Sequence, residues 1–218
     1  MSATVRVGAL LWVLCLQFFL GQFIAQLAWP AYSMVIDDIS VLGATVCGAE
    51  NTSPDGTAYV CSPLNLVFNA SLTLQGVLSA LGAILTWSAW PRSRLTGVGL
   101  SLAVIGGVGT AMAGIFPYNV NLPLHALGAL TDFTLANIGF ILLGVVLTRH
   151  GSRALGSFSI AAGIVSLAAF VLYVSGVHFG VRGIVERFVA YPQTVWYVVM
   201  GIAILSNRVP AFGHGRHN

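Results

Sequence analysis

Long runs of apolar residues alternate with short polar breaks along almost the whole chain. A helix needs about 20 apolar residues to cross the hydrocarbon core of a bilayer. The pattern therefore predicts an all-α membrane protein whose six transmembrane helices form one domain over residues 1–218. The expected spans cover approximately residues 7–28, 66–89, 96–116, 124–148, 154–177 and 189–207.

The first apolar run has an alternative interpretation as a cleaved signal peptide, because Arg6 precedes it. Cleavage after Ala28 would place Gln26 three residues before the cut, where signal peptidase requires a small side chain. The run is also longer than the apolar core of a signal peptide. We therefore expect the first helix to be retained.

Composition agrees with a membrane protein, since 57% of the residues are hydrophobic and only 7% are charged. A soluble domain carries roughly 25% charged residues, so a soluble enzyme is excluded. The net charge of +3 comes from a chain without lysine, and such a small excess bears on topology more than on anionic partners. We expect the lipid bilayer as the surrounding medium and no nucleic acid as a partner.

The distribution of arginine predicts the orientation. Cytoplasmic segments of membrane proteins carry most of the basic residues. The bias is satisfied when both termini are cytoplasmic and the long loop at 29–65 is extracytoplasmic. This orientation puts Arg182 and Arg187 outside. It puts the remaining arginines inside: Arg6, Arg92, Arg94, Arg149, Arg153, Arg208 and Arg216.

Cys47 and Cys61 both lie in the predicted extracytoplasmic loop. Disulfides persist on that side of the membrane, and this one would close a loop of about 15 residues, worth about 3 kcal/mol in the chain-entropy model. We expect Cys47 and Cys61 to form a disulfide and Cys15 to be a buried apolar residue of the first span.

Asp132 is the ionisable residue that falls well inside a predicted span. A charge in the hydrocarbon core costs about 2.5–3.5 kcal/mol on insertion scales, so this side chain should face the interior of the bundle. His125 precedes it by two helical turns and lies on the same face. Either these residues form a functional site, or Asp132 is a protonated or hydrogen-bonded residue that holds helices together.

Other polar residues gather at the predicted outer ends of the helices. Gln22 and Gln26 share a face of the first helix, and Asn69 lies on the second. Asp38 follows the first span, and Arg187 precedes the sixth. We expect these side chains to line, or to cap, a polar pocket that opens outward. The alternative is that they form hydrogen bonds between helices and have only a structural role.

Three short motifs occur in a familiar order. They are Tyr32-Ser-Met-Val-Ile-Asp-Asp-Ile-Ser-Val-Leu-Gly43, Gly114-Ile-Phe-Pro117, and His125-Ala-Leu-Gly-Ala129 followed by Phe133. In order and spacing the chain resembles the bacterial and archaeal membrane-protein family called domain of unknown function 998, with Asp38, Ser40, Leu42, Gly43, Phe116, Pro117 and His125 carrying the matches. The resemblance implies six spans in a prokaryotic inner membrane and no established reaction.

Three functions therefore stay open. The first is a non-enzymatic protein of the plasma membrane that binds a lipid, a small amphiphile or a membrane partner. The second is an intramembrane enzyme that uses Asp38, His125 and Asp132 as acids, bases or metal ligands. The third is a transporter coupled to protons through Asp132, although no span looks broken at mid-membrane. We expect no cofactor and no resident metal, because neither His-x-x-x-His nor Cys-x-x-Cys occurs.

Overall fold

The computed structural model describes residues 1–53, 56–177 and 179–209. This part of the chain is mostly helical and contains one short antiparallel hairpin. Arg216, one of the predicted cytoplasmic arginines, lies outside the described residues. The helices are α1 (Ala3–Leu14), α2 (Gln17–Leu27), η1 (Ile39–Gly43), α3 (Asn65–Thr86), η2 (Trp87–Ala89), α4 (Arg94–Ile115), α5 (Leu122–Thr131), η3 (Asp132–Ala136), α6 (Asn137–Arg149), α7 (Arg153–Val174) and α8 (Arg182–Leu205). The strands are β1 (Gly48–Ser53) and β2 (Gly56–Val60).

In the described part of the chain, six helical segments are long and apolar enough to cross a membrane, as predicted. The chain is a multi-pass membrane protein, and the lipid bilayer is its environment. The segments are Ala3–Leu27, Asn65–Ala89, Arg94–Ile115, Leu122–Arg149, Arg153–Val174 and Arg182–Leu205.

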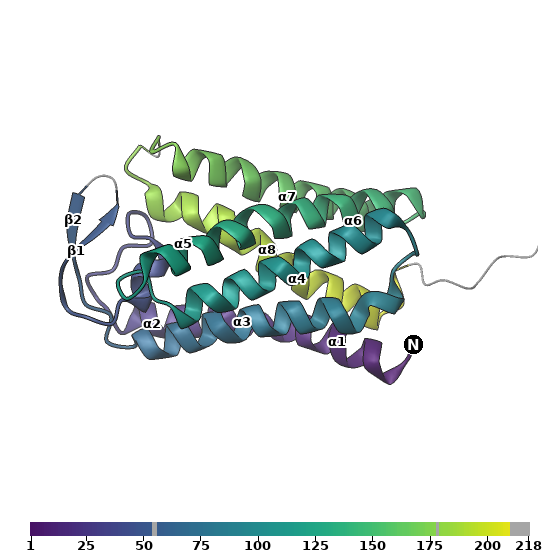
Figure 1. Ribbon diagram of the computed structural model, residues 1–218, viewed down its shortest axis with the longest axis horizontal. Helices are drawn as coiled ribbons and strands as arrows, with labels where there is room; N and C mark the ends of the chain where they lie inside the picture. The colour runs from purple at the N-terminus through teal and green to yellow at the C-terminus, as the bar shows by residue number, and fades with distance from the viewer. Residues whose placement is uncertain (54–55, 178, 210–218) are drawn as a thin grey trace, which may run out of the picture.

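The segments form a closed ring of neighbours. α1 packs against α3 and α8, α4 lies between α3 and α6, and α7 lies between α6 and α8 (Figure 1). Close approach of α3 and α4 depends on glycine. A Cβ atom at Gly76 would lie 2.2 Å from the backbone nitrogen of Ala111, so a side chain there would force the two helices apart.

The two ends of the bundle differ in composition. One end carries the hairpin, η1 and the first turn of α8, and we call it the loop end (Figure 1). The opposite end, where α1 begins and α8 finishes, we call the arginine end. The arginines of the described chain divide between them as the orientation argument requires, with Arg182 and Arg187 at the loop end.

The first span differs from the unbroken helix that its sequence suggests. It consists of α1 and α2 joined by a tighter turn at Cys15 and Leu16, where Phe18 N–H donates to the carbonyl of Cys15 at 3.1 Å. Gln17 follows the turn, and its amide donates to the backbone carbonyl of Ser71 on α3 at 2.9 Å. The sequence offers neither proline nor glycine as a signal at Cys15 and Leu16, so it gave no indication of the turn, although the span itself is present as expected.

The sixth span begins earlier than predicted, at Arg182 instead of near residue 189. Three charged residues therefore belong to the first two turns of α8, and the sequence pattern had assigned them to a loop. They are tolerated because each has protein partners: Arg182 binds Asp38, Glu186 accepts from the backbone N–H of Ile39, and Arg187 binds backbone carbonyls.

An aromatic cluster fills the interior toward the arginine end. The ring of Phe140 stacks on Trp196 with centroids 3.9 Å apart, and Trp12 meets Trp196 edge to face at 5.4 Å. Trp12 Nε1 donates to the carbonyl of Ser79, and Trp196 Nε1 donates to Ser159 Oγ. The cluster closes this half of the bundle with large apolar side chains, and the N–H groups of Trp12 and Trp196 are paired.

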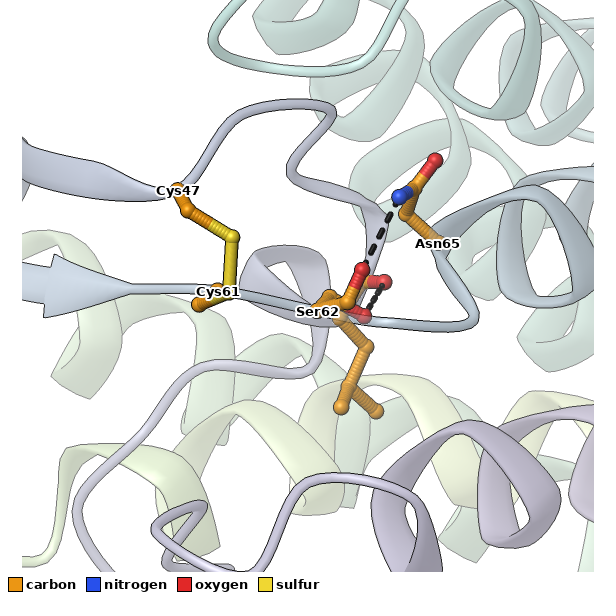
Figure 2. Close-up of a disulfide and its surroundings, with 5 residues drawn as sticks. Cys47, Cys61, Ser62 and Asn65 are labelled. Atoms are coloured by element: carbon orange, nitrogen blue, oxygen red, sulfur yellow. Dashed lines mark hydrogen bonds between the residues drawn. A yellow bond between two sulfur atoms is a disulfide. The ribbon is translucent and has the colours of Figure 1, made fainter.

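The disulfide between Cys47 and Cys61 is present, as predicted. It joins the base of a β1–β2 hairpin that the sequence analysis did not foresee, with Gly48 opposite Val60 in the register. Ser62 follows Cys61 in the sequence (Figure 2). Its hydroxyl donates to the backbone carbonyl of Leu42, and its own backbone carbonyl accepts from Asn65 Nδ2 at 2.9 Å. The hairpin is therefore tied both to η1 and to the start of α3.

Thiol counting tests the disulfide in the protein itself. We expect intact-mass measurement after alkylation of the denatured, unreduced protein to show one labelled thiol, because Cys15 is free and buried in the native bundle. After reduction the count should rise to three. Three labels without reduction would contradict the disulfide.

Candidate functional site at the loop end

A cavity of about 630 Å³ lies inside the loop-end half of the bundle, and we call it the loop-end cavity. Residues of α3, α4, α5, η3, α7 and α8 form its walls, and Asp38 to Ser40 close it at the loop end. Most of the wall is apolar, with aromatic rings that include Phe68, Phe133 and Phe170. Volumes of this size hold small ligands in other proteins.

Asp132 lies at the base of the cavity and is only 7% exposed. Gln193 of α8 faces it with its amide nitrogen 2.9 Å from both carboxylate oxygens, in the orientation that also lets its oxygen accept from Asn137 Nδ2 at 2.7 Å. The hydroxyl of Thr110 on α4 lies beside this carboxyl group and donates to the carbonyl of Gly106 at 3.1 Å. Four helical elements thus contribute to one polar network in the middle of the membrane, where unpaired polar groups are costly.

A π-helical turn holds Asp132 in place. Residues Asp132–Ala136 wind more widely than the α-helical segments α5 and α6 on either side. Such turns are rare and are frequent at functional sites, because they displace a few side chains from the regular helical pattern. Here the displaced side chain is the carboxylate that meets Gln193.

The rim of the cavity carries a compact ion-pair network. Arg182 Nε lies 3.0 Å from both carboxylate oxygens of Asp38. Tyr173 Oη donates to Asp38 at 2.6 Å and accepts from Arg182 Nη2 at 2.6 Å. Burial raises the pKa of Asp38 above its ordinary value, whereas the hydrogen bonds from Tyr173 and the charge of Arg182 act in the opposite direction.

Glu186 lies one turn further along α8 and also lines the cavity. One of its carboxylate oxygens, Oε2, accepts from the backbone N–H of Ile39, which fixes the first residue of η1 against α8. The side chain is buried, with 5% of its surface exposed. Glu186 therefore brings a second carboxyl group close to Asp38 and Arg182 at the rim.

His125 lines the opposite wall, on α5. Its Nδ1 lies 3.0 Å from the carbonyl oxygens of Ala113 and Phe116 at the end of α4. Both neighbours are acceptors, so Nδ1 carries the proton and Nε2 is the nitrogen left for the cavity. Tyr118 packs edge-on against the imidazole, and burial raises the pKa of Tyr118 to about 12, which keeps its hydroxyl protonated.

A family model matches the sequence over residues 7–203. The chain belongs to the family described as "Protein of unknown function (DUF998)". This agrees with the resemblance seen in the three sequence motifs. No curated protein and no solved structure matches the chain.

The family motifs fall at the loop end. Asp38 and Ser40 line the cavity, and His125 stands on the opposite wall. Phe116, in the Gly-x-Phe-Pro motif, supplies one of the carbonyls that His125 binds. The motif residues thus form the rim, and they do not reach the aromatic cluster at the arginine end.

The sequence-predicted site residues separate into two groups. Asp38, His125 and Asp132 line the loop-end cavity together. Gln22, Gln26, Asn69 and Arg187 do not line it, and this corrects the expectation that they would.

The second group holds structural elements in place. Gln22 Nε2 donates to the hydroxyl of Tyr191 at 2.5 Å, and Asn69 Nδ2 donates to the carbonyl of Gly43 at 2.9 Å. Gln26 comes from the same face of α2 as Gln22, outside the cavity lining. Arg187 Nη1 donates to three carbonyls, including those of Met34 and Gly183, so it anchors the chain before η1 to α8.

Several site residues were missed by the sequence analysis. Arg182, and not Arg187, pairs with Asp38, while Gln193 and Thr110 complete the network around Asp132. One signal for Gln193 was available, because the polar pair Gln193-Thr194 follows Pro192 inside an otherwise apolar span. In the described part of the chain, no group of three or more His, Cys, Asp or Glu residues is arranged to hold a metal ion.

The rim ion pair makes a stability prediction. Arg182→Met should lower the free energy of unfolding by about 3 kcal/mol, because it leaves the buried Asp38 carboxylate without its cation. Adding Asp38→Asn should recover most of that loss. Arg153→Met, at an exposed position of the arginine end, should change stability by less than about 0.5 kcal/mol. Unfolding curves in one detergent measure the free energy of unfolding of all three variants. A value for Arg182→Met equal to that of the wild-type protein would contradict the role of the pair.

Proposed function

We propose that this chain is a non-enzymatic protein of the plasma membrane, the inner membrane in a prokaryote, that binds a lipid or small amphiphile in the loop-end cavity. The observation that carries the proposal is the combination of an apolar wall with a polar rim in one cavity of about 630 Å³. An amphiphile has the same division, because its chain requires apolar surface and its headgroup requires polar partners.

A lateral opening supports the proposal. The cavity is lined by α5 on one side and by α7 on the other, yet α5 packs on α4 and shares no extended interface with α7 among the described residues. Leu122, Leu130 and Val174 line the cavity here and are 60%, 48% and 63% exposed. An alkyl chain could therefore enter between α5 and α7 directly from the bilayer.

The aromatic cluster favours binding over passage. It occupies the interior between the base of the cavity and the arginine end, and Tyr197 belongs to both the cluster and the cavity wall. A route through the bundle would have to cross Trp12, Trp196 and Phe140, which are fully buried. A cavity that the aromatic cluster closes toward the arginine end suits a binding protein.

An intramembrane enzyme is the second candidate, because Asp38, His125 and Asp132 line the same cavity. Each of the three is engaged by the protein: Asp38 by Arg182, Asp132 by Gln193, and His125 through Nδ1. His125 Nε2 is the group best suited to general acid–base chemistry. Conversion of a bound amphiphile that is lost in His125→Ala, with binding retained, would favour this candidate.

Proton-coupled transport is the third candidate. Two features at mid-span support it, the turn at Cys15 and Leu16 and the π-helical turn that begins at Asp132. It needs a second state in which the aromatic cluster opens. Accumulation of a probe in sealed vesicles, driven by a pH gradient and lost in Asp132→Asn, would favour it.

The proposed orientation places the loop end outside the cell. Reporter fusions after Arg94, Arg153 and Arg208 should report a cytoplasmic location, and fusions near Gly56 and Asn119 an external one, since basic residues concentrate at the arginine end. An external reading after Arg208 would reverse the orientation and would put the cavity on the cytoplasmic side.

A variant at the lateral opening tests the cavity. Ala126 is exposed and lines the cavity, whereas its neighbour Leu127 is exposed and does not. We expect Ala126→Trp to abolish retention of a co-purifying lipid or amphiphile, because the indole fills the entrance, and Leu127→Trp to retain it. Native mass spectrometry after gentle purification measures the bound species, and thermal melting checks folding. Equal retention in the two folded variants would contradict entry between α5 and α7.

A further inference from the structure

We infer that the loop-end cavity selects an amphiphile with a primary ammonium headgroup, held at Glu186. The inference rests on the proposed function and adds the chemical class of the ligand. It follows from the charge of the cavity wall, from the hydrogen-bonding groups left without partners there, and from the aromatic rings beside them.

The charges at the loop end leave a carboxyl excess. Asp38 pairs with Arg182 at 3.0 Å. Behind the wall, Arg187 lies near Asp37 and donates to its carbonyl oxygen. Three carboxyl groups (Asp37, Asp38 and Glu186) and two arginines (Arg182 and Arg187) leave one negative charge in excess at the loop end, and Glu186, which lines the cavity, is the carboxyl group that makes no ion pair with either arginine among the described residues. Asp132 lies deeper and adds a further carboxyl group, with the neutral Gln193 as its partner.

Glu186 has an oxygen to spare. Its Oε2 accepts from Ile39 N–H, whereas Oε1 makes no hydrogen bond with any described residue. A buried carboxylate is stable only when a cation or hydrogen-bond donors compensate it. A ligand ammonium group would supply both a positive charge and N–H donors at this point.

Gln75 leaves a second acceptor open, deeper in the cavity, at the level of Thr194 and not of Glu186. It lines the cavity and is 5% exposed. Its Nε2 donates to Thr194 Oγ1 at 3.2 Å, while its Oε1 is buried without a partner among the described residues. Buried acceptors of this kind are uncommon, and they are satisfied by a bound water or by a ligand with donors.

The walls near Glu186 suit a cation as well. Tyr118 and Tyr173 line the cavity on either side of the rim, and the rings of Phe68 and Phe170 continue the wall. The guanidinium of Arg182 already lies 4.2 Å from the centroid of the Tyr173 ring. Aromatic faces attract cations electrostatically and repel anions. A phosphate or sulfate headgroup would meet ring faces and the two carboxyl groups of Asp38 and Glu186 at this point, against the single guanidinium of Arg182 that Asp38 already binds.

The depth of Glu186 agrees with a headgroup position. It lies in the second turn of α8, and Gln193 lies seven residues further along, which is about 10 Å of helix. The headgroup would stay near the membrane surface while the alkyl chain leaves between α5 and α7. Either a single-chain amine or phosphatidylethanolamine carries this ammonium chemistry.

Probes of equal chain length test the inference. Dodecylammonium, dodecanol and dodecyl sulfate are titrated into the full-length protein in a nonionic maltoside detergent at neutral pH. We expect dodecylammonium to bind at least about tenfold more tightly than dodecyl sulfate, the difference made by a hydrogen bond to a charged group. Sulfate affinity equal to or above that of the amine overturns the inference and leaves the proposed function standing. If none of the three binds, the proposed function fails as well.

Two matched variants locate the site. Glu186→Gln keeps an acceptor for Ile39 and should weaken dodecylammonium about tenfold without changing the affinity for dodecanol. Asp37→Asn also removes one carboxylate of the loop end, but Asp37 does not line the cavity, so affinity should stay unchanged. Equal weakening in both variants would show that the ligand responds to the overall negative charge of the loop end, and it would overturn the assignment to Glu186. If Glu186→Gln fails to fold, the comparison of ammonium with sulfate in the wild-type protein still decides the headgroup charge.

Lipid competition separates the two sources of the ammonium. The protein is incubated with equal amounts of phosphatidylethanolamine and phosphatidylcholine, and retained lipid is measured by native mass spectrometry. Preferential retention of phosphatidylethanolamine supports a lipid ligand, and equal retention with tight dodecylammonium binding supports a single-chain amine. Preference for phosphatidylcholine, whose headgroup lacks N–H donors, overturns the proposed hydrogen bond to Glu186.

Discussion

The cavity exists because the chain between α2 and β1 is tied to the first two turns of α8. Asp38 binds Arg182, Ile39 N–H binds Glu186, and Arg187 holds the carbonyls before η1. These contacts join residues about 150 positions apart in sequence and lie where the bundle meets the membrane surface. Buried charged groups are stable there only when they are paired with one another or hydrogen-bonded. The same contacts close the cavity at the loop end and set the positions of Asp38, Arg182 and Glu186.

The spans were predictable because the bilayer imposes a length and a composition that a single sequence displays directly. The disulfide was predictable because the two cysteines shared a short loop. The inward position of Asp132 followed from the cost of exposing a carboxylate to lipid. All three arguments depend on residues close together in sequence or on the solvent, and they needed no knowledge of which helices touch.

The rest of the site depends on contacts between distant segments. Gln193 reaches Asp132 across 61 positions, and choosing Arg182 over Arg187 as the partner of Asp38 requires knowing which face of α8 meets the loop. The two arginines are five residues apart, so they point in different directions on one helix. The sequence pattern also started the sixth span after its charged residues, since it could not foresee that the loop before β1 would supply hydrogen-bond partners for them. Asn69 and Gln22 were predicted as pocket residues because the sequence does not show their partners. These partners are the carbonyl of Gly43 and the hydroxyl of Tyr191.

The aromatic cluster has an electrical consequence. Water or a ligand in the loop-end cavity brings a polarisable medium some way into the membrane, while Trp12, Trp196 and Phe140 leave the other half dry. The membrane voltage therefore falls mainly across the cluster, where each elementary charge moved through the full drop costs about 2.3 kcal/mol per 100 mV. A charge that stops at the rim crosses little of that field. Its occupancy is then governed by its concentration in the leaflet at the loop end, almost independently of the membrane voltage.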